Sequence, residues 1–234
     1  MLCVYGIVRS DHPGASTVGV QGGQTRIVAL ADLGVIVSDV DDELLARRRD
    51  IEAHLTVLET AMRNGDVLPF RFGMAVADEQ ALPAALEGSV PRFRQLLDEL
   101  SGRVQMTLKV VRDDFESMRT VIAGDARLRR VVERERTRGS ADINDRISLG
   151  AEVSGAVDQL SERDAELIIA RLGSLADAIS TSPPTPPVVA SVALLVQPQR
   201  VPELDAAIEE LQQQLGMRAS FDYAGPMPPY SFVA

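Results

Sequence analysis

Only two side chains in this sequence, His12 and His54, are of the type that most often moves protons near neutral pH. His12 lies in a loop that is rich in proline and glycine, where a histidine is expected at the surface. His54 lies within one helical turn of Ile51 and Leu58, so it borders the apolar face of a predicted helix. A proton shuttle would need a partner carboxylate, and the sequence places none beside it. We therefore favour a structural role for His54.

Two polar segments near the start of the chain resemble anion and metal sites but lack the required spacing. The glycine-rich stretch GVQGGQ, residues 19–24, precedes a strand, whereas phosphate-binding loops lead into a helix N-terminus. Asp39, Asp41, Asp42 and Glu43 do not follow EF-hand spacing, and capping of a helix explains the middle two. The sequence also contains no GxSxG, HExxH or CxxC motif. We therefore predict no catalytic residue, no metal site and no cofactor.

The stretch VLPFRFG, residues 67–73, combines aromatic residues with proline and a cation. It contains Pro69, Phe70, Arg71 and Phe72. In a strand, the two phenylalanines would share one face and the arginine would occupy the other. We therefore predict that half of the stretch enters the core and half is presented to a partner.

The final ten residues, GPMPPYSFVA at 225–234, are unusually rigid and aromatic for a chain end. Their three prolines exclude a helix or a central strand. Tyr230 and Phe232 alternate beside them and supply apolar area, and proline lowers the entropy lost on docking. Such a tail should be docked on a surface. Sealing of the core and contact with a partner both explain it.

One basic stretch, DARLRRVVERERTR at residues 125–138, interrupts an acidic chain. A solvated helix with ion pairs between residues four apart accounts for it. The alternative is a docking stripe for an acidic partner, with Arg129 and Arg130 as its central residues.

Composition narrows the class of protein further. The chain has 234 residues, of which 45% are hydrophobic and 25% charged, and this is ordinary globular composition. A net charge of −10 argues against non-specific binding to nucleic acid or to anionic membranes. A single cysteine, Cys3, excludes an intrachain disulfide and fits a reducing compartment. No segment has the pattern of a signal peptide or a membrane span, so we predict a cytoplasmic protein.

The elements that position these residues follow an α+β order. The pattern of the first half predicts strands at 2–8, 26–30 and 35–40, and then a helix that begins after Asp41 and Asp42 and ends at Asn64-Gly65. It further predicts a strand and turn at 67–73, short helices at 79–88 and 89–102, and a strand at 104–111. The second half predicts a helix to Arg138, a break at Gly139-Ser140, a second helix from Asn144 whose apolar stripe reaches Ile179, a strand at 188–196, a helix at 201–216 and a strand at 217–223.

This order predicts two domains. The first comprises residues 1–103, with an α+β fold. The second comprises residues 104–224 and maps onto a ferredoxin-like split βαβ arrangement whose first crossover is enlarged by a long helical hairpin. The proline-rich tail, residues 225–234, would be docked on the fold.

The segments CVYGIV, VLPFRFG, VQMTLKV and GPMPPYSFV together resemble the GvpF/GvpL family of gas vesicle accessory proteins. The resemblance spans almost the whole chain in order, and the terminal Gly-Pro-x-Pro-Pro-Tyr-Ser-Phe signature is its most specific part. Met227 stands at the variable position, where tryptophan is frequent in the family. The resemblance implies two α+β domains, the second ferredoxin-like, and a non-enzymatic role in the cytoplasm and in association with gas vesicles.

The partners that this resemblance implies are the hydrophobic gas vesicle shell protein and other gas vesicle accessory proteins. A soluble acidic protein can cover the apolar surface and sheet edges that such a subunit exposes before assembly. The rival hypothesis is a ferredoxin-like protein that binds or converts a small molecule in a cleft near His54 and Arg71.

Overall fold

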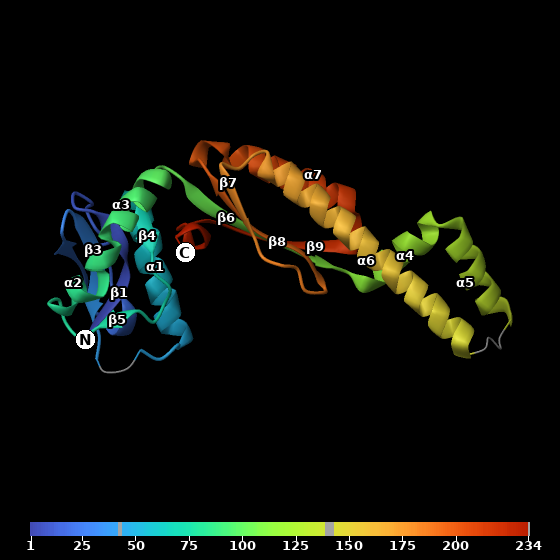
Figure 1. Cartoon of the computed structure of the whole chain (residues 1–234), viewed down its shortest axis with the longest axis horizontal. Coiled ribbons are helices and arrows are strands. Elements are labelled where there is room, and N and C mark those ends of the chain that lie inside the picture. The colour runs from blue at the N-terminus through green and yellow to red at the C-terminus, as the bar shows by residue number, and fades with distance from the viewer. Residues whose placement is uncertain (42–43, 139–142, 234) are drawn as a thin grey trace. The chain divides into compact units, whose positions relative to one another are not determined.

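A computed structural model describes residues 1–41, 44–138 and 143–233 of the chain (Figure 1). The chain divides into two compact units, each of which we describe by itself. The first comprises residues 1–106, 195–198 and 225–234, and the second comprises residues 107–194 and 199–224. The domain bounds predicted from the sequence stay a prediction.

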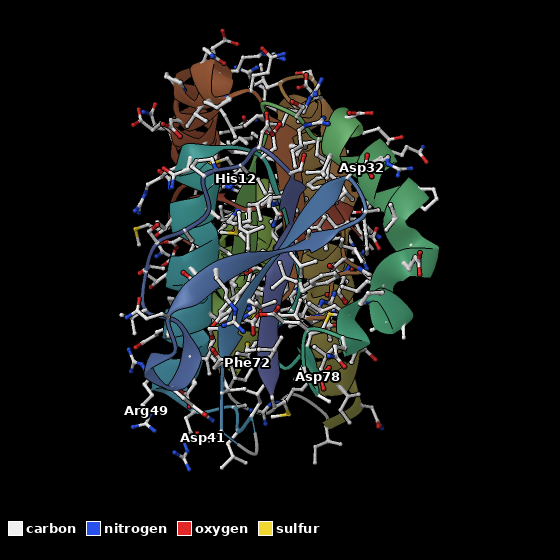
Figure 2. The ribbon with its side chains drawn as sticks, turned by 90° about the vertical axis from the view of Figure 1, so that its left-hand side faces the viewer. His12, Asp32, Asp41, Arg49, Phe72 and Asp78 are labelled. Carbon is white, nitrogen blue, oxygen red and sulfur yellow. The ribbon has the colours of Figure 1, made fainter. Side chains whose placement is uncertain are left out.

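The first unit is built on an antiparallel sheet whose strand order is β2-β3-β1-β4, with β5 also paired to β1. Its strands are β1 (Leu2–Arg9), β2 (Thr25–Leu30), β3 (Leu33–Asp39), β4 (Val67–Pro69) and β5 (Ala75–Val76). The three strands predicted at the start of the chain are therefore confirmed. β1 and β3 are buried almost throughout, because helices cover both faces of the sheet (Figure 2).

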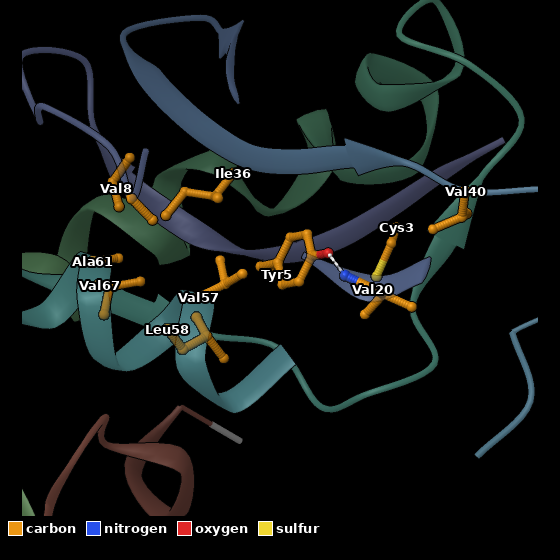
Figure 3. Packing of buried hydrophobic residues seen from close by; sticks show 11 residues of the cluster. Cys3, Tyr5, Val8, Val20, Ile36, Val40, Val57, Leu58, Ala61 and Val67 are labelled. Atoms are coloured by element: carbon orange, nitrogen blue, oxygen red, sulfur yellow. Dashed lines mark hydrogen bonds between the residues drawn. The ribbon is translucent and has the colours of Figure 1, made fainter. Parts of the chain in front are cut away.

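One face of this sheet is covered by α1 (Arg48–Asn64), and the other by α2 (Ala81–Leu86) and α3 (Val90–Glu99). The apolar side of α1 contributes Val57, Leu58 and Ala61 to a buried cluster with Tyr5 and Ile36 of the strands (Figure 3). Each of these side chains removes apolar area from water and stabilises the fold by about 1–3 kcal/mol when fully buried.

The start of α1 differs from the prediction. The helix begins at Arg48, with Arg47 as its N-cap residue, and not directly after Asp41. The chain is still fixed to the glycine-rich loop at this point, because the backbone N–H of Asp41 donates to the Gln21 side chain at 2.8 Å. Asp42, the other predicted cap, lies outside the described residues.

The second unit contains most of a second antiparallel sheet, with strand order β7-β8-β6-β9. Its elements are β6 (Val104–Arg112), α4 (Asp114–Gly124), α5 (Ala126–Arg138), α6 (Ile143–Gly173), β7 (Ala178–Thr181), β8 (Val188–Val196), α7 (Val201–Leu215) and β9 (Ala219–Met227). The strands predicted at 104–111, 188–196 and 217–223 and the helix predicted at 201–216 are confirmed.

Two predictions for the long helices are wrong. The first helix is interrupted at Asp125, whose side chain accepts hydrogen bonds from the backbone N–H groups of Arg127 (2.7 Å) and Leu128 (3.2 Å) and so starts a new helix. The second helix ends at Gly173 and does not continue to Ile179, which lies in the short strand β7. The predicted break at Gly139-Ser140 lies outside the described residues.

A partly buried ion pair connects two helices of the second unit. The guanidinium of Arg218 donates to both carboxylate oxygens of Asp164 on α6, at 2.9 and 3.0 Å. It also donates to the carbonyls of Gln214 and Leu215, which are among the unpaired carbonyls at the end of α7. One side chain therefore fixes the end of α7 against α6.

Candidate functional site

His54 lies in the interior of the first unit. It is 1% exposed, and its ring stacks on that of Tyr5 with a centroid distance of 5.0 Å. The Nε2 atom donates a hydrogen bond to the Phe70 carbonyl at 3.0 Å, which leaves Nδ1 as an acceptor. Nδ1 has no hydrogen-bond partner among the described residues. Burial lowers the pKa of His54 below its usual 6.5, against the opposing effect of the Phe70 carbonyl.

The hydroxyl of Tyr5 connects this interior to the glycine-rich loop. It accepts a hydrogen bond from the backbone N–H of Val20 at 2.8 Å (Figure 3). It shares a second hydrogen bond with the Ser38 hydroxyl at 2.7 Å. Burial raises the pKa of Tyr5 to about 12. The loop at residues 19–24 is therefore tied to the core. Two of its glycines serve close packing, because a Cβ on Gly19 would overlap the Tyr5 hydroxyl and one on Gly23 would overlap the Asp39 carbonyl.

The stretch at residues 67–73 forms a strand only as far as Pro69, which is buried. The backbone N–H of Phe70 then donates to the Tyr5 carbonyl at 2.7 Å, and the chain turns. The Phe70 ring packs edge to face on Phe93 of α3, with a centroid distance of 5.9 Å.

Phe72 turns to the opposite side of the sheet, where its ring packs edge to face on His54 of α1 at 5.7 Å. The prediction that Phe70 and Phe72 share one face is therefore wrong, because the strand alternation on which it rested ends at Pro69. Both rings are half-buried, and Arg71 between them is exposed. Arg71 is therefore accessible, and its contact with a partner stays a prediction.

The tail packs on the first unit through Gln105, a side chain that is buried in β6. The Gln105 side-chain oxygen accepts a hydrogen bond from the backbone N–H of Ser231 at 2.8 Å, and its amide nitrogen lies 3.7 Å from the Met227 sulfur. Gly225 has φ +135°, and a Cβ there would lie 2.6 Å from the Met106 sulfur. The first three residues of the tail continue β9, an edge strand, which is where a sheet tolerates proline.

The remainder of the tail forms a short 3-10 turn at Tyr230–Phe232 after two buried prolines. The Tyr230 ring packs against the core cluster that contains Val57 and Leu58. Its hydroxyl is buried without a hydrogen-bond partner among the described residues. Burial, followed by the nearby charge of Glu59, raises the pKa of Tyr230. Phe232 is half-buried.

Arg129 and Arg130 belong to the second unit, on α5, and both are exposed. Leu128 beside them is buried against Val153 and Val157 of α6, so the apolar side of α5 faces its own unit. The structure therefore gathers Pro69, Phe70, Phe72 and Tyr230 around the core of the first unit and places the two arginines on another unit.

Asp39, at the end of β3, and His12 both have structural partners. Asp39 pairs with Arg26 at 2.7 Å, and this guanidinium lowers the pKa of the carboxyl. Within the described ranges no three His, Cys, Asp or Glu side chains gather to hold a metal ion; Asp42 and Glu43 lie outside those ranges. The His12 ring Nε2 lies 3.2 Å from the Ala61 carbonyl near the end of α1, and its Nδ1 accepts from the Gly14 N–H.

Two clefts of the first unit bear on the hypothesis of a small-molecule site near His54 and Arg71. One cleft of the first unit, of about 590 Å³, is lined by Gly19, Arg47 and Arg49 among others. Another, of about 330 Å³, lies between the end of α1, β4 and the end of α3. Neither His54 nor Arg71 lines these two clefts.

The whole sequence matches one protein family. The family described as "Gas vesicle synthesis protein GvpL/GvpF" matches residues 1–234. The chain belongs to the GvpL/GvpF family. A role in gas vesicles follows from this membership.

Curated relatives of this GvpL/GvpF-family chain carry the name gas vesicle protein F. That of Streptomyces sp. (strain CB03234) is 33% identical over 98% of both chains. That of Haloferax mediterranei is 27% identical over 99% of this chain and 92% of its own length.

Solved structures share the fold. The crystal structure of GvpF from Microcystis aeruginosa has a TM-score of 0.80 at 23% identity, covering 100% of this chain and 98% of that one. That of GvpF from Anabaena sp. PCC7120 has a TM-score of 0.81 at 21% identity, with coverage of 100% and 95%. Within the described ranges, no helix of this GvpL/GvpF-family chain combines the length and apolar character that a bilayer crossing requires.

Reasoning from sequence missed an exposed apolar surface of this GvpL/GvpF-family chain. Phe115 and Met118 on α4 are 65% and 40% exposed, and Met217 is 75% exposed. α4 and the turn that carries Met217 are adjacent, because the backbone N–H of Asp113 donates to the Arg218 carbonyl at 2.8 Å. We call these three residues the α4 patch. Their only sequence signal is spacing: Phe115 and Met118 are three residues apart on one helix face.

Proposed function

We propose that this protein is a non-catalytic gas vesicle assembly factor that binds the hydrophobic shell subunit before or during its assembly. The observation that carries the proposal is the α4 patch: three large apolar side chains exposed on a chain of net charge −10. Exposed clusters of large apolar side chains mark protein contact surfaces, while surplus charge keeps the carrier soluble. A shell subunit has the complementary property, since it must bury apolar surface when it polymerises.

The chemistry of the α4 patch suits a partner that presents apolar side chains. Phe115 lies at the start of α4, and the Arg119 guanidinium lies 5.9 Å from its ring centroid. Arg119 also pairs with Glu116 at 2.9 Å, so its charge is balanced within the helix. The patch therefore offers an apolar centre with a polar edge, which is the usual anatomy of a protein interface.

The remaining predicted contact residues have a different part in this proposal. Pro69, Phe70, Phe72, Tyr230 and Phe232 stabilise the first unit, which their burial and packing support. Exposed side chains remain available for partners, which include other gas vesicle accessory proteins. Arg71 is exposed and belongs to this second group.

We further propose that the second unit is a ferredoxin-like domain with an enlarged first crossover, and that the tail is a clasp on the first unit. In support, helices connect β6 to β7 and β8 to β9, β7 leads directly into β8, and the strand order β7-β8-β6-β9 is that of a split βαβ sheet. We also propose a location in the cytoplasm and in association with gas vesicles. The buried, unpaired Cys3 is compatible with a reducing compartment.

Affinity capture from cells that co-express the shell subunit tests the function. The tagged wild-type chain should retain the shell subunit, whereas a variant with Phe115→Ser, Met118→Ser and Met217→Ser should retain several-fold less. Its melting temperature should stay within about 2 °C of the wild type, because exposed side chains contribute little to stability.

A matched control removes exposed apolar side chains from the first unit, with Leu55→Ser and Val18→Ser, which are 40% and 51% exposed in the native protein. This control should capture as much shell subunit as the wild type. If the wild type captures none, the proposed function is wrong. Equal capture by the wild type and the α4-patch variant would leave the function standing and show that another surface makes the contact.

A further inference from the structure

A groove in the second unit lies between α6 and the proline-rich segment that leads into β8. Its volume is about 480 Å³. One wall is formed by Pro184, Pro186 and Pro187 together with the first residues of β8, and the other by α6 around Ala165. These side chains give the groove an apolar floor. It therefore suits a segment of protein that brings apolar side chains or the stem of a long polar one.

The α6 side of this groove carries negative charge that its own unit does not neutralise. Asp158, at one end, is paired with Arg112 at 2.9 Å. Glu162 and Glu166 also line the groove and are exposed. No cationic side chain among the described residues lies within ion-pairing distance of either one. Residues four apart on a helix lie on the same face with their Cβ atoms about 5–6 Å apart, so these two carboxylates are neighbours on the surface of α6.

α5 carries the complementary pattern. Arg130 and Arg134 are exposed and are also four residues apart. No carboxylate of the residues that the structure describes lies within ion-pairing distance of either guanidinium. Arg127 differs, because it pairs with Glu152 of α6. Leu128 holds the opposite side of α5 in the core of its own unit, so the two arginines face outward.

The arginines cannot reach the groove of their own chain. Arg127, at the start of α5, contacts Glu152 on α6. From there α5 runs toward the start of α6 at Ile143, as Figure 1 shows, and so away from the groove. Glu152 and Glu162 are separated by about 15 Å along the helix at 1.5 Å per residue. A helix with this arginine pattern could therefore enter the groove only from another molecule.

We propose that two copies of this chain associate through these surfaces, with α5 of each copy seated in the groove of the other. Arg130 and Arg134 of one copy pair with Glu166 and Glu162 of its partner, and the arginine stems cover the apolar floor. A two-fold arrangement makes this contact twice. The net charge of −10 opposes association at long range, so the contact depends on these local pairs. This inference is independent of shell-subunit binding.

Sedimentation velocity of the full chain tests the proposal through a charge swap. The wild type at about 100 μM should contain dimer. The variant Arg130→Glu/Arg134→Glu and the variant Glu162→Lys/Glu166→Lys should each associate on the order of 100-fold more weakly, because four like-charge pairs replace four ion pairs. An equimolar mixture of the two variants should restore the dimer, because each contact then joins opposite charges again.

The matched control, Arg47→Glu/Arg92→Glu, makes the same change of net charge on two exposed arginines of the first unit and should dimerise like the wild type. Restoration by mixing also shows that both variants are folded. Three outcomes would overturn the proposal: a wild type that stays monomeric, association that neither reversal weakens, or reversed variants that fail to associate when mixed.

Discussion

Two tyrosines of the first unit differ in whether their buried hydroxyl groups have hydrogen-bond partners. Replacing each by phenylalanine should therefore have opposite effects on stability. The Tyr230 hydroxyl is buried without a partner among the described residues. The Tyr5 hydroxyl binds the Val20 N–H at 2.8 Å and the Ser38 hydroxyl at 2.7 Å. A buried polar group without a hydrogen bond costs about 1–3 kcal/mol. The Tyr230→Phe variant removes such a group, whereas Tyr5→Phe creates two.

We therefore expect Tyr230→Phe to raise the free energy of unfolding by about 1 kcal/mol and Tyr5→Phe to lower it by about 2–4 kcal/mol. For a chain of this length these changes correspond to an increase in melting temperature of about 2–4 °C and a decrease of about 4–16 °C. Both variants keep the aromatic ring, so packing changes little in either. The two effects can then be assigned to the hydroxyl groups.

Urea denaturation followed by circular dichroism measures both variants against the wild type. The denaturation midpoint should shift in opposite directions while the slope with denaturant stays constant. If Tyr230→Phe lowers the midpoint as Tyr5→Phe does, the Tyr230 hydroxyl has a favourable partner in solution. The account of the tail as a segment held by packing and by Gln105 would then be wrong.

Two further predictions concern His54 and the anchor of the tail. Because burial lowers the pKa of His54 in the folded chain below 6.5, the unfolded chain binds a proton at this residue more readily. The stability that neutral His54 contributes is therefore fully present above about pH 6.5 and is lost as the pH falls below that value. His54→Gln should flatten the dependence of the urea midpoint between about pH 7 and pH 5.5, and an unchanged slope would contradict this origin. Gly225→Ala should lower the calorimetric melting temperature by an amount equivalent to about 2–3 kcal/mol, since φ is +135° and its Cβ would lie 2.6 Å from the Met106 sulfur. The control Gly155→Ala on α6 meets nothing within 4 Å and should be neutral or stabilising by up to about 1 kcal/mol, so equal losses at both sites would refute the crowding argument.

Local pattern located most of the elements but could not define their ends. β1, β3, β8 and α7 carry strong apolar patterns, and all four were predicted within a few residues. β7 was missed, because its four residues alternate between half-buried and exposed and lack a long apolar run. The break at Asp125 was missed for a different reason. A polar residue in a charged helix resembles a solvated position until its capping hydrogen bonds are seen.

The candidate site depended on contacts between residues far apart in the sequence, which no local pattern specifies. Periodicity placed His54 beside the apolar face of α1, and the structure buries it. Sequence reasoning placed Phe70 and Phe72 on one face, which required a strand as far as Phe72, but β4 ends at Pro69. Gln105 resembles any polar residue in an alternating strand. Its hydrogen bond to Ser231 joins positions 126 residues apart.

The motifs that mark the family and the surfaces available to partners occupy different parts of this chain. The aromatic–proline stretches are buried or half-buried in the first unit, where Phe72 packs on His54 and Tyr230 closes the core. The α4 patch and Arg130 lie in the second unit, in segments without a distinctive motif. Substitutions in the motifs should therefore act first on stability, and loss of partner binding would follow from unfolding. Substitutions in the α4 patch should reduce binding at an unchanged melting temperature, so measuring both quantities on each variant separates a structural role from a contact role.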